Sequence, residues 1–248
     1  MSSWLQGAVC TSPNTCTGLS YPSNAGISGV ATGAQSLAQA LDGTDGRIVY
    51  SYSEGGSVAT YYLQKYAGNT GQPAPGQVAF IMVANPNSAK GGAIPALYLG
   101  APTPTDSGYT IVEVSREYDG LSDFPTDPSN LLAVANAIAG IGVLHPDYSK
   151  VDLYSSDNLV ARDGSTTYVV APTQNLPLLQ PLRQLGLNQL ADQLNAPLKK
   201  AVDAGYDRSS YHSMTQADVD DIQAVITGDG SPSSGSDGSA SRTALAAP

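Results

Sequence analysis

Residues 47–57, with the sequence RIVYSYSEGGS, contain the pattern that decides the fold predicted for this chain. Residues 48–50 are β-branched or aromatic, which is typical of a buried strand, and residues 57–66 have the composition of a helix. Ser53 stands between them, at the apex of a strand–turn–helix unit. This is the context of a nucleophile elbow, in which a strained turn exposes a serine hydroxyl at the carboxyl end of a strand.

The residues around Ser53 test that interpretation. A nucleophile elbow needs small residues two positions before and after the serine, because the turn is crowded. Gly55 meets this need, whereas Ser51 stands where glycine is usual, so the match to G-x-S-x-G is one residue short. A Ser/Gly-rich loop after a buried strand is the alternative interpretation of the same residues.

Length and composition limit the classes of function. The chain has 248 residues, enough for a substantial core, and only 13% of them are charged, with a net charge of −10. Nucleic acid is excluded as a partner because no Lys/Arg cluster is present. We also expect no membrane span, since no apolar run approaches about 18 residues, and the first residues do not resemble a signal peptide. No His/Cys set has zinc spacing, so we expect no metal site. Acyl transfer through a serine, the chemistry considered below, needs no organic cofactor.

The remaining periodicity predicts a mostly parallel central sheet flanked by helices. Residues 77–84 (QVAFIMVA) form a continuous apolar run, as in a strand buried on both faces, and residues 110–118 (TIVEVSREY) predict another strand. Helices are expected at 31–41 and 128–140. This order of elements is that of an α/β fold, and we place it in one domain, residues 1–227.

The last hundred residues are less regular. We expect residues 151–154 and 166–170 to pair as a small β-hairpin insertion, and residues 215–227 to form the final helix. Residues 228–248 are rich in Gly and Ser and are expected to form a flexible tail, which offers a contact for an assembly partner.

Between the hairpin and the final helix, residues 176–202 are rich in Leu and Pro. We expect short broken helices there, because Pro181 and Pro197 each remove a backbone donor from any longer helix. A core role for the apolar face of these helices is favoured over a lid or a lipid channel.

A serine nucleophile needs a base and an acid that orients the base. The chain has two histidines, and His145 follows an apolar helix in a loop-like setting, whereas His212 lies near the tail. Asp119 follows the predicted strand 110–118 directly and is the expected acid, with Asp123 as the alternative. The order Ser53, Asp119, His145 is the chain order of the catalytic residues in α/β-hydrolases.

Two further features are left open by the residues alone. The backbone N–H of Glu54 is the expected first donor of an oxyanion hole, because it follows the nucleophile. The second donor is not placed, and residues 17–28 are only a candidate. Cys10 and Cys16 are close enough in the chain to close a small disulfide loop, and they fit free thiols equally well.

Taken together, these motifs resemble the PE-PPE domain family of mycobacterial serine hydrolases, which are relatives of cutinases. The resemblance runs along about residues 20–208. The similar segments are 50–56 (YSYSEGG), 85–87 (NPN) with 91–92 (GG), 102–106 (PTPTD), 116–125 (REYDGLSDFP), 143–145 (VLH), 166–168 (TTY), 172–173 (PT), 176–183 (LPLLQPLR) and 205–208 (GYDR).

The resemblance implies an α/β-hydrolase-like fold, a Ser53, Asp119 and His145 triad, and action on acyl esters, with acyl transfer onto trehalose lipids of the envelope in some members. It also implies a location in the cell envelope or outside the cell, and it excludes His212, which lies beyond the matching segments. The chain departs from the family at Ser51, at Asn175, where many relatives have histidine, and in the region before Tyr21, where the first strand and its oxyanion loop are shortened or absent.

Two hypotheses of function follow. The first is a serine esterase or acyltransferase that acts on acyl esters of lipids, expected to be mycobacterial envelope lipids. The alternative is a catalytically weak or inactive hydrolase-like module, with a structural or binding role in a mycobacteriophage virion or a cell envelope. Labelling of Ser53 by a fluorophosphonate discriminates between them, because only an activated serine reacts rapidly.

Overall fold

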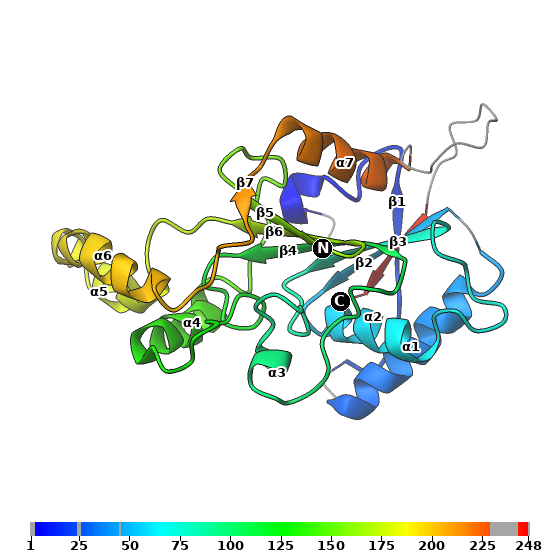
Figure 1. The fold of residues 1–248 in the computed structure, drawn as a ribbon, viewed down its shortest axis with the longest axis horizontal. Coiled ribbons are helices and arrows are strands. Elements are labelled where there is room, and N and C mark those ends of the chain that lie inside the picture. The colour runs from blue at the N-terminus through cyan, green and yellow to red at the C-terminus, as the bar shows by residue number, and fades with distance from the viewer. Residues whose placement is uncertain (1–2, 24–25, 45, 229–242, 248) are drawn as a thin grey trace.

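The computed structural model describes residues 3–23, 26–44, 46–228 and 243–247. Within them, one sheet carries helices on both of its faces (Figure 1). The strand order across this sheet is β1 (Thr15–Gly18), β8 (Thr243–Ala247), β2 (Arg47–Tyr52), β3 (Val78–Val83), β4 (Thr110–Arg116), β6 (Thr166–Ala171), β5 (Leu159–Asp163) and β7 (His212–Ser213). Neighbours from β1 to β6 in this order are parallel, and β5 is antiparallel to both β6 and β7. The predicted α/β-hydrolase-like fold, with its mostly parallel sheet, is confirmed.

Different helices cover the two faces of the sheet. Helices α1 (Ile27–Leu41) and α2 (Glu54–Lys65) lie on one face, and α7 (Gln216–Thr227) and the short helix η1 (Trp4–Gly7) lie on the other (Figure 1). Helix α7 confirms the final helix that was predicted from the sequence. Thr215 caps this helix by accepting a hydrogen bond from the backbone N–H of Asp218.

Alternation along the central strands explains why their sequences are apolar throughout. Successive side chains of a strand point to opposite faces. In β2, Val49 packs with α1 and α2, whereas Ile48 and Tyr50 belong to the cluster that contains η1 and α7. In β3 every residue is buried. A strand covered on both faces must be apolar at every position, which is the pattern read in residues 77–84.

A group of helices packs at one end of the sheet (Figure 1). It contains α4 (Leu131–Val143), η2 (Pro177–Leu179), α5 (Gln180–Gln184) and α6 (Asn188–Asp203). The expected helix break at Pro197 is wrong, because α6 continues through this residue. Pro197 is exposed, so water can bind the carbonyl that lacks its helical partner. Helix α3 (Ala93–Ala96) is a single turn that lies below the carboxyl end of the sheet.

The hairpin lies elsewhere in the chain than expected. Residues 151–154 form no strand, and β5 pairs with β6 instead. Because β6 also pairs with β4, the hairpin extends the central sheet. Val151 and Leu153 are buried in the core below it, so apolar packing rather than strand pairing accounts for their pattern.

The C-terminal segment also differs from expectation. Residues 229–242 and 248 of the predicted flexible tail lie outside the described residues, whereas β8 within it pairs with β1 and β2. A five-residue segment has little strand signal of its own. Its pairing satisfies backbone groups on β2 that would otherwise form an open sheet edge.

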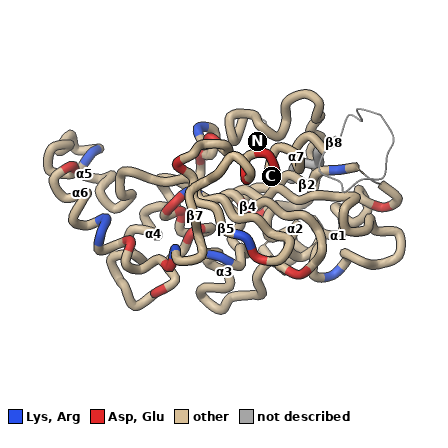
Figure 2. Tube along the Cα trace, turned by 45° about the horizontal axis from the view of Figure 1, so that its top comes forward, with Lys and Arg blue, Asp and Glu red and all other residues tan. Residues whose placement is uncertain are grey.

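Charged residues are distributed unevenly over the fold. Helix α1 contains no Lys, Arg, Asp or Glu, and neither do residues 91–105, which include α3. Figure 2 shows many of the charges around α4 to α6 and the loops near β5 and β7, with others beside α1 and α2. These two segments therefore contribute no charged side chain to the surface.

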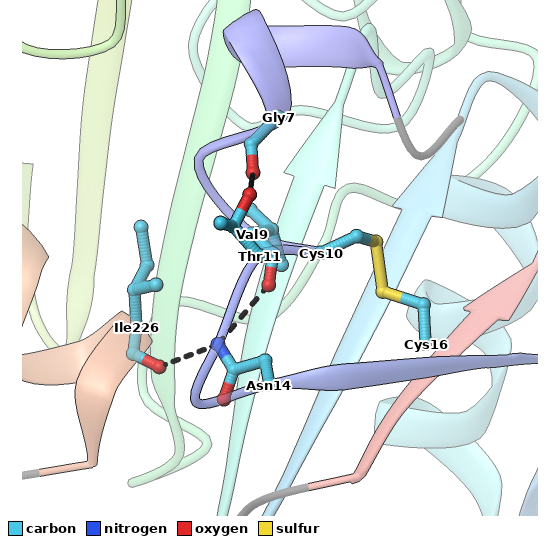
Figure 3. Close-up of a disulfide and its surroundings, with 7 residues drawn as sticks. All are labelled: Gly7, Val9, Cys10, Thr11, Asn14, Cys16 and Ile226. Atoms are coloured by element: carbon cyan, nitrogen blue, oxygen red, sulfur yellow. Dashed lines mark hydrogen bonds between the residues drawn. A yellow bond between two sulfur atoms is a disulfide. The ribbon is translucent and has the colours of Figure 1, made fainter.

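Cys10 and Cys16 form a disulfide, so the alternative of free thiols does not hold (Figure 3). The loop that it closes is also held by Asn14, whose side-chain amide donates to the carbonyls of Val9 and Ile226 at 3.0 and 2.9 Å. The second of these bonds joins the N-terminal segment to the end of α7. The disulfide and Asn14 together fix the segment that leads into β1.

Two glycines let α4 lie directly against the turn that follows β4. A Cβ on Gly140 would lie 1.9 Å from the carbonyl oxygen of Tyr118, and a Cβ on Gly120 would lie 2.1 Å from that of Ala137. No larger residue fits at either position without moving a backbone. This contact sets the position of Asp119, which lies between Tyr118 and Gly120.

We therefore predict that Gly140→Ala lowers the free energy of unfolding by at least about 1–3 kcal/mol, the usual cost of overpacking. Gly142→Ala, in the same helix, is the matched control because a Cβ there meets nothing within 4 Å. This control should be neutral or stabilising by up to about 1 kcal/mol, from helix propensity. Urea unfolding of both variants measures the difference, and equal midpoints would contradict the proposed contact.

Candidate active site

Ser53 lies in a strained turn at the carboxyl end of β2. Its φ and ψ angles are 50° and −113°, a conformation that non-glycine residues seldom adopt. Its backbone N–H donates to the carbonyl of Val83 at 3.0 Å, which continues the pairing of β2 with β3. Helix α2 starts at the next residue. This is the strand–turn–helix geometry expected of residues 47–57, and Ser51, which is fully buried, is accommodated in it.

His145 reaches Ser53 from the end of α4. The distance from Ser53 Oγ to His145 Nε2 is 2.8 Å, and His145 Nδ1 lies 2.9 Å from Asp119 Oδ2. An ionised carboxylate only accepts hydrogen bonds, so the network assigns the proton to Nδ1. Nε2 is then left as the acceptor for the serine hydroxyl. The structure thus brings the side chains of Ser53, His145 and Asp119 into contact. The histidine lies between the serine and the aspartate, as expected from the sequence.

Asp119 is completely buried and is surrounded by donors. Besides His145, it accepts hydrogen bonds from the hydroxyl of Tyr148 at 2.6 Å and from the backbone N–H of Leu121 at 3.0 Å. Burial and the nearby Asp119 carboxylate raise the pKa of Tyr148 well above its usual value, so this hydroxyl remains a donor. These bonds stabilise the charge of the carboxylate, which has no contact with water.

The imidazole is also held from other directions. The hydroxyl of Tyr52 donates to the backbone carbonyl of His145 at 2.6 Å, and the two rings are stacked with centroids 5.2 Å apart. Arg116 donates to the carbonyls of Leu144 and Asp147 at 3.2 and 2.8 Å. The loop that carries His145 is therefore held by a contact on the imidazole ring and by hydrogen bonds to the carbonyls of His145 and its neighbours.

Tyr148, Tyr52 and Arg116 also belong to this site, and none of them was predicted from the sequence to do so. The position of Tyr52, directly before Ser53, was the one sequence signal that could have placed it in the site. Tyr148 is one of 14 tyrosines in the chain, and nothing in its local sequence distinguishes it. Its role depends on the folded loop that turns its hydroxyl toward Asp119.

The alternative acid and the second histidine lie in other networks. Asp123 accepts two hydrogen bonds from the guanidinium of Arg208, at 2.8 and 2.6 Å, and one from the backbone N–H of Tyr118 at 2.9 Å. His212 contacts Asp218 through Nε2 at 3.0 Å. The side chains of Asp123 and His212 are therefore engaged elsewhere, although the backbone N–H of Asp123 donates to the carbonyl of Asp119 at 2.6 Å.

An apolar pocket opens beside Ser53. It has a volume of about 590 Å³, and among the described residues that line it, Glu54 is the one charged side chain. Gly26 and Ile27, at the end of the candidate oxyanion segment 17–28, lie on its edge, and residues 24–25 of that segment lie outside the described residues. The apolar lining comes chiefly from Ile27, Val30, Ala93, Ile94, Leu97, Leu99 and Leu121.

The part of the chain that the structure describes contains neither a metal-binding cluster nor a membrane-spanning helix. No cluster of three or more His, Cys, Asp or Glu side chains there has a geometry that would hold a metal ion. None of the described helices combines the length and the apolar character needed to cross a bilayer.

Comparison with known proteins identifies relatives of the chain. The PE-PPE domain profile matches residues 9–207. The esterase PE16 of Mycobacterium tuberculosis is 36% identical over 66% of this chain and 34% of its own length. The diacyltrehalose acyltransferase Chp2 of the same organism is 30% identical over 79% of this chain and 61% of its own length. The SL1278 acyltransferase Chp1, again from M. tuberculosis, is 32% identical over 77% of this chain and 50% of its own length.

These relatives are longer than the region of similarity, since the match spans about a third of PE16 and three fifths of Chp2. No solved structure matches the chain. The family profile nevertheless covers most of the sequence and includes Ser53, Asp119 and His145. The chain belongs to the PE-PPE domain family.

Proposed function

We propose that this protein is a serine esterase or acyltransferase that acts on acyl esters of lipids. The observation that carries the proposal is the contact of Ser53 Oγ with His145 Nε2 at 2.8 Å, with Asp119 behind the ring, at the edge of an apolar pocket. A hydroxyl, a neutral imidazole nitrogen and a buried carboxylate in this order are the components of acyl transfer through a serine.

In the proposed first half-reaction, Ser53 Oγ attacks the carbonyl carbon of an ester while its proton passes to His145 Nε2. Asp119 remains ionised and stabilises the imidazolium that forms. The negative charge that develops on the carbonyl oxygen needs donors, and the N–H of Glu54 at the start of α2 is the expected one. The helix dipole of α2 favours negative charge at the same end.

Collapse of this intermediate breaks the ester C–O bond. The leaving alcohol takes the proton from His145 Nε2, and the acyl group remains on Ser53. In the second half-reaction, His145 Nε2 removes a proton from water or from an acceptor hydroxyl, whose oxygen attacks the acyl carbon. As the bond between the acyl group and Ser53 Oγ breaks, His145 returns that proton to Oγ, which regenerates Ser53. Hydrolysis and transfer therefore share every protein group and differ in the acceptor.

The pocket supports a lipid substrate. Its lining is apolar apart from Glu54 and a few hydroxyl and amide groups, so an acyl chain would be removed from water next to the attacking oxygen. The named relatives include an esterase and two acyltransferases, one of them for diacyltrehalose. We extend this to propose that the substrates are acyl lipids of the mycobacterial envelope, and that the protein acts there.

The direct test is hydrolysis of a medium-chain p-nitrophenyl ester. We expect Ser53→Ala and His145→Ala each to lower kcat by about 10⁴-fold or more, in line with the loss of a member of such a triad. His212→Ala is the matched control, because it removes the other histidine and should leave kcat unchanged. Rapid labelling of the wild type, but not of Ser53→Ala, by a fluorophosphonate is expected. Equal rates for Ser53→Ala and the wild type would end the proposal, and failure to label Ser53 would favour a non-catalytic module.

A second prediction concerns the buried tyrosine. Tyr148→Phe removes one donor from the charged Asp119 and should lower the free energy of unfolding by about 1.5–3 kcal/mol, the range for hydrogen bonds to ionised groups. We also expect kcat to fall about tenfold, because Asp119 then orients His145 less firmly. Tyr154→Phe is the control, since its hydroxyl bonds to no other described residue. A Tyr148→Phe enzyme as stable and as fast as this control would show that the bond is dispensable.

The third prediction tests the pocket as the acyl site. Ile94→Trp should narrow the pocket and lower kcat/KM for long-chain esters more than for acetyl esters, because a longer acyl chain fills more of the pocket. Leu185→Trp, on the exposed end of α5, is the control. The comparison is a chain-length series of p-nitrophenyl esters. A uniform loss at every length would argue against this path for the acyl chain.

A further inference from the structure

Glu113 is a buried carboxyl group that the proposed reaction does not use. It lies in the middle of β4, is 2% exposed, and stands in register with Met82 of β3 and Tyr168 of β6. Among the described residues, no Lys, Arg or His forms an ion pair with it. A carboxyl group in such a position needs another role, because burying it is costly.

The hydrogen bonds of Glu113 lead to the loop that follows β3. Glu113 Oε1 accepts from Asn85 Nδ2 at 3.0 Å, and the same amide nitrogen donates to Thr103 Oγ1 at 2.9 Å. Asn85 Oδ1 accepts from the backbone N–H of Asn87 at 3.0 Å. The loop begins at Ala84 with a φ of 54°, so it turns sharply in a conformation that needs such support.

From this loop the network reaches the substrate pocket. Asn87 Oδ1 accepts from Ser57 Oγ at 2.7 Å, and Thr103 Oγ1 lies 2.7 Å from Thr60 Oγ1. Ser57, Thr60 and Asn87 line the pocket together with Ser53. Ser57 and Thr60 belong to α2, the helix that begins directly after Ser53. Glu113 is thus connected, through Asn85, to the polar wall of the pocket and to the nucleophile helix.

The side chain of Asn85 packs directly against the backbone of α2. A Cβ on Gly56 would lie 2.7 Å from Asn85 Oδ1, so the amide and the helix backbone touch. A shift of Asn85 must therefore be transmitted to α2 or to the loop.

We propose that Glu113 is a positioning residue, which sets the polar wall of the substrate pocket through Asn85 and does so best in its protonated form. The part of this proposal that concerns substrate rests on the proposed function. The part that concerns the buried network stands on the contacts alone.

Two hydroxyl groups provide the physical link between protonation and geometry. Ser88 Oγ donates to the carbonyl of Lys90 and Thr103 Oγ1 to that of Asn87, each at 3.2 Å. Each hydroxyl has one proton to donate. Burial raises the pKa of Glu113 to about 7, and the neighbouring Ser88, Asn85 and Thr103 side chains oppose that rise. Glu113 Oε2 bonds to no other described residue. An ionised Glu113 would draw these protons to itself and release the carbonyl of Asn87 from Thr103.

The other titratable or charged groups around Glu113 do not change charge in the same range. Tyr168 faces Glu113 from β6, and Tyr211 lies directly before β7. Burial raises the pKa of both phenols. Lys90 lies 5.9 Å from the centre of the Tyr168 ring, and Arg208, paired with Asp123, lies beyond Tyr211. Met82 is the residue that pairs with Glu113 on β3.

The first test is independent of activity. A carboxyl whose folded pKa is raised stabilises the fold fully below its unfolded pKa, and that contribution is lost as pH rises through the folded value. The Tm of the wild type relative to Glu113→Gln should therefore fall as pH rises from about 4.5 to about 7 and level off above that. Glu117→Gln, the same change at the residue that pairs with Lys199 at 3.2 Å, should retain the wild-type profile. A difference in Tm between the wild type and Glu113→Gln that does not vary with pH overturns the proposal.

The second test separates binding from chemistry. For a medium-chain p-nitrophenyl ester, the KM of the wild type should rise severalfold above neutral pH, whereas the KM of Glu113→Gln stays flat and the pH dependence of kcat is the same in both. Asn85→Ala should raise KM at every pH. A KM profile of Glu113→Gln that follows the wild type overturns the positioning role.

If no ester is turned over, the proposed function fails separately. Calorimetric titration of Ser53→Ala with octanol, an uncharged probe, then replaces KM. Its affinity should weaken with rising pH, and the decrease should be absent in the double variant Ser53→Ala/Glu113→Gln. Equal pH dependence in both proteins contradicts the proposal.

Discussion

The left-handed backbone conformation of Ser53 is the constraint on which the site depends. Two contacts hold it: the hydrogen bond from Ser53 N–H to Val83 and the close approach of Gly56 to Asn85. The first ties the turn to β3, and the second fixes the start of α2 against the neighbouring loop. With the turn held in this way, the serine hydroxyl points away from the sheet and toward His145. The strain is local, and the surrounding core supports it.

The other half of the site depends on an equally close contact. Gly120 and Gly140 bring the backbone of α4 against the turn after β4, so the carboxyl of Asp119 and the ring of His145 approach one another from two elements far apart in the chain. Tyr148 adds the donor that a buried carboxylate requires. The position of His145 relative to Asp119 therefore depends on the packing of α4. On the pocket side of α2, the hydrogen-bonded cluster of Glu113, Asn85 and Thr103 contacts the helix through Thr60.

Much of this could be predicted from local sequence. The apolar run of β3, the small residues after Ser53 and the order of Ser53, Asp119 and His145 all lie in short segments with strong individual signals. Other features depend on residues elsewhere in the chain, which no local sequence pattern identifies. The pairing of β8 depends on an edge of β2, the continuation of α6 through Pro197 depends on solvent at that face, and the burial of Val151 depends on the core beneath it. The pairing of Cys10 with Cys16 was likewise left open by the sequence.

By itself, the sequence determined the kinds of element, their order, and which serine, aspartate and histidine stand at the ends of those elements. Periodicity and turn chemistry act over a few residues, so they are legible without a fold. Only the tertiary structure decided which groups complete the site: Tyr148 on Asp119, Tyr52 on His145, and Asn85 between Glu113 and the pocket. These contacts join residues 18 to 93 positions apart. Their partners are selected by packing geometry, which no single stretch of the chain contains.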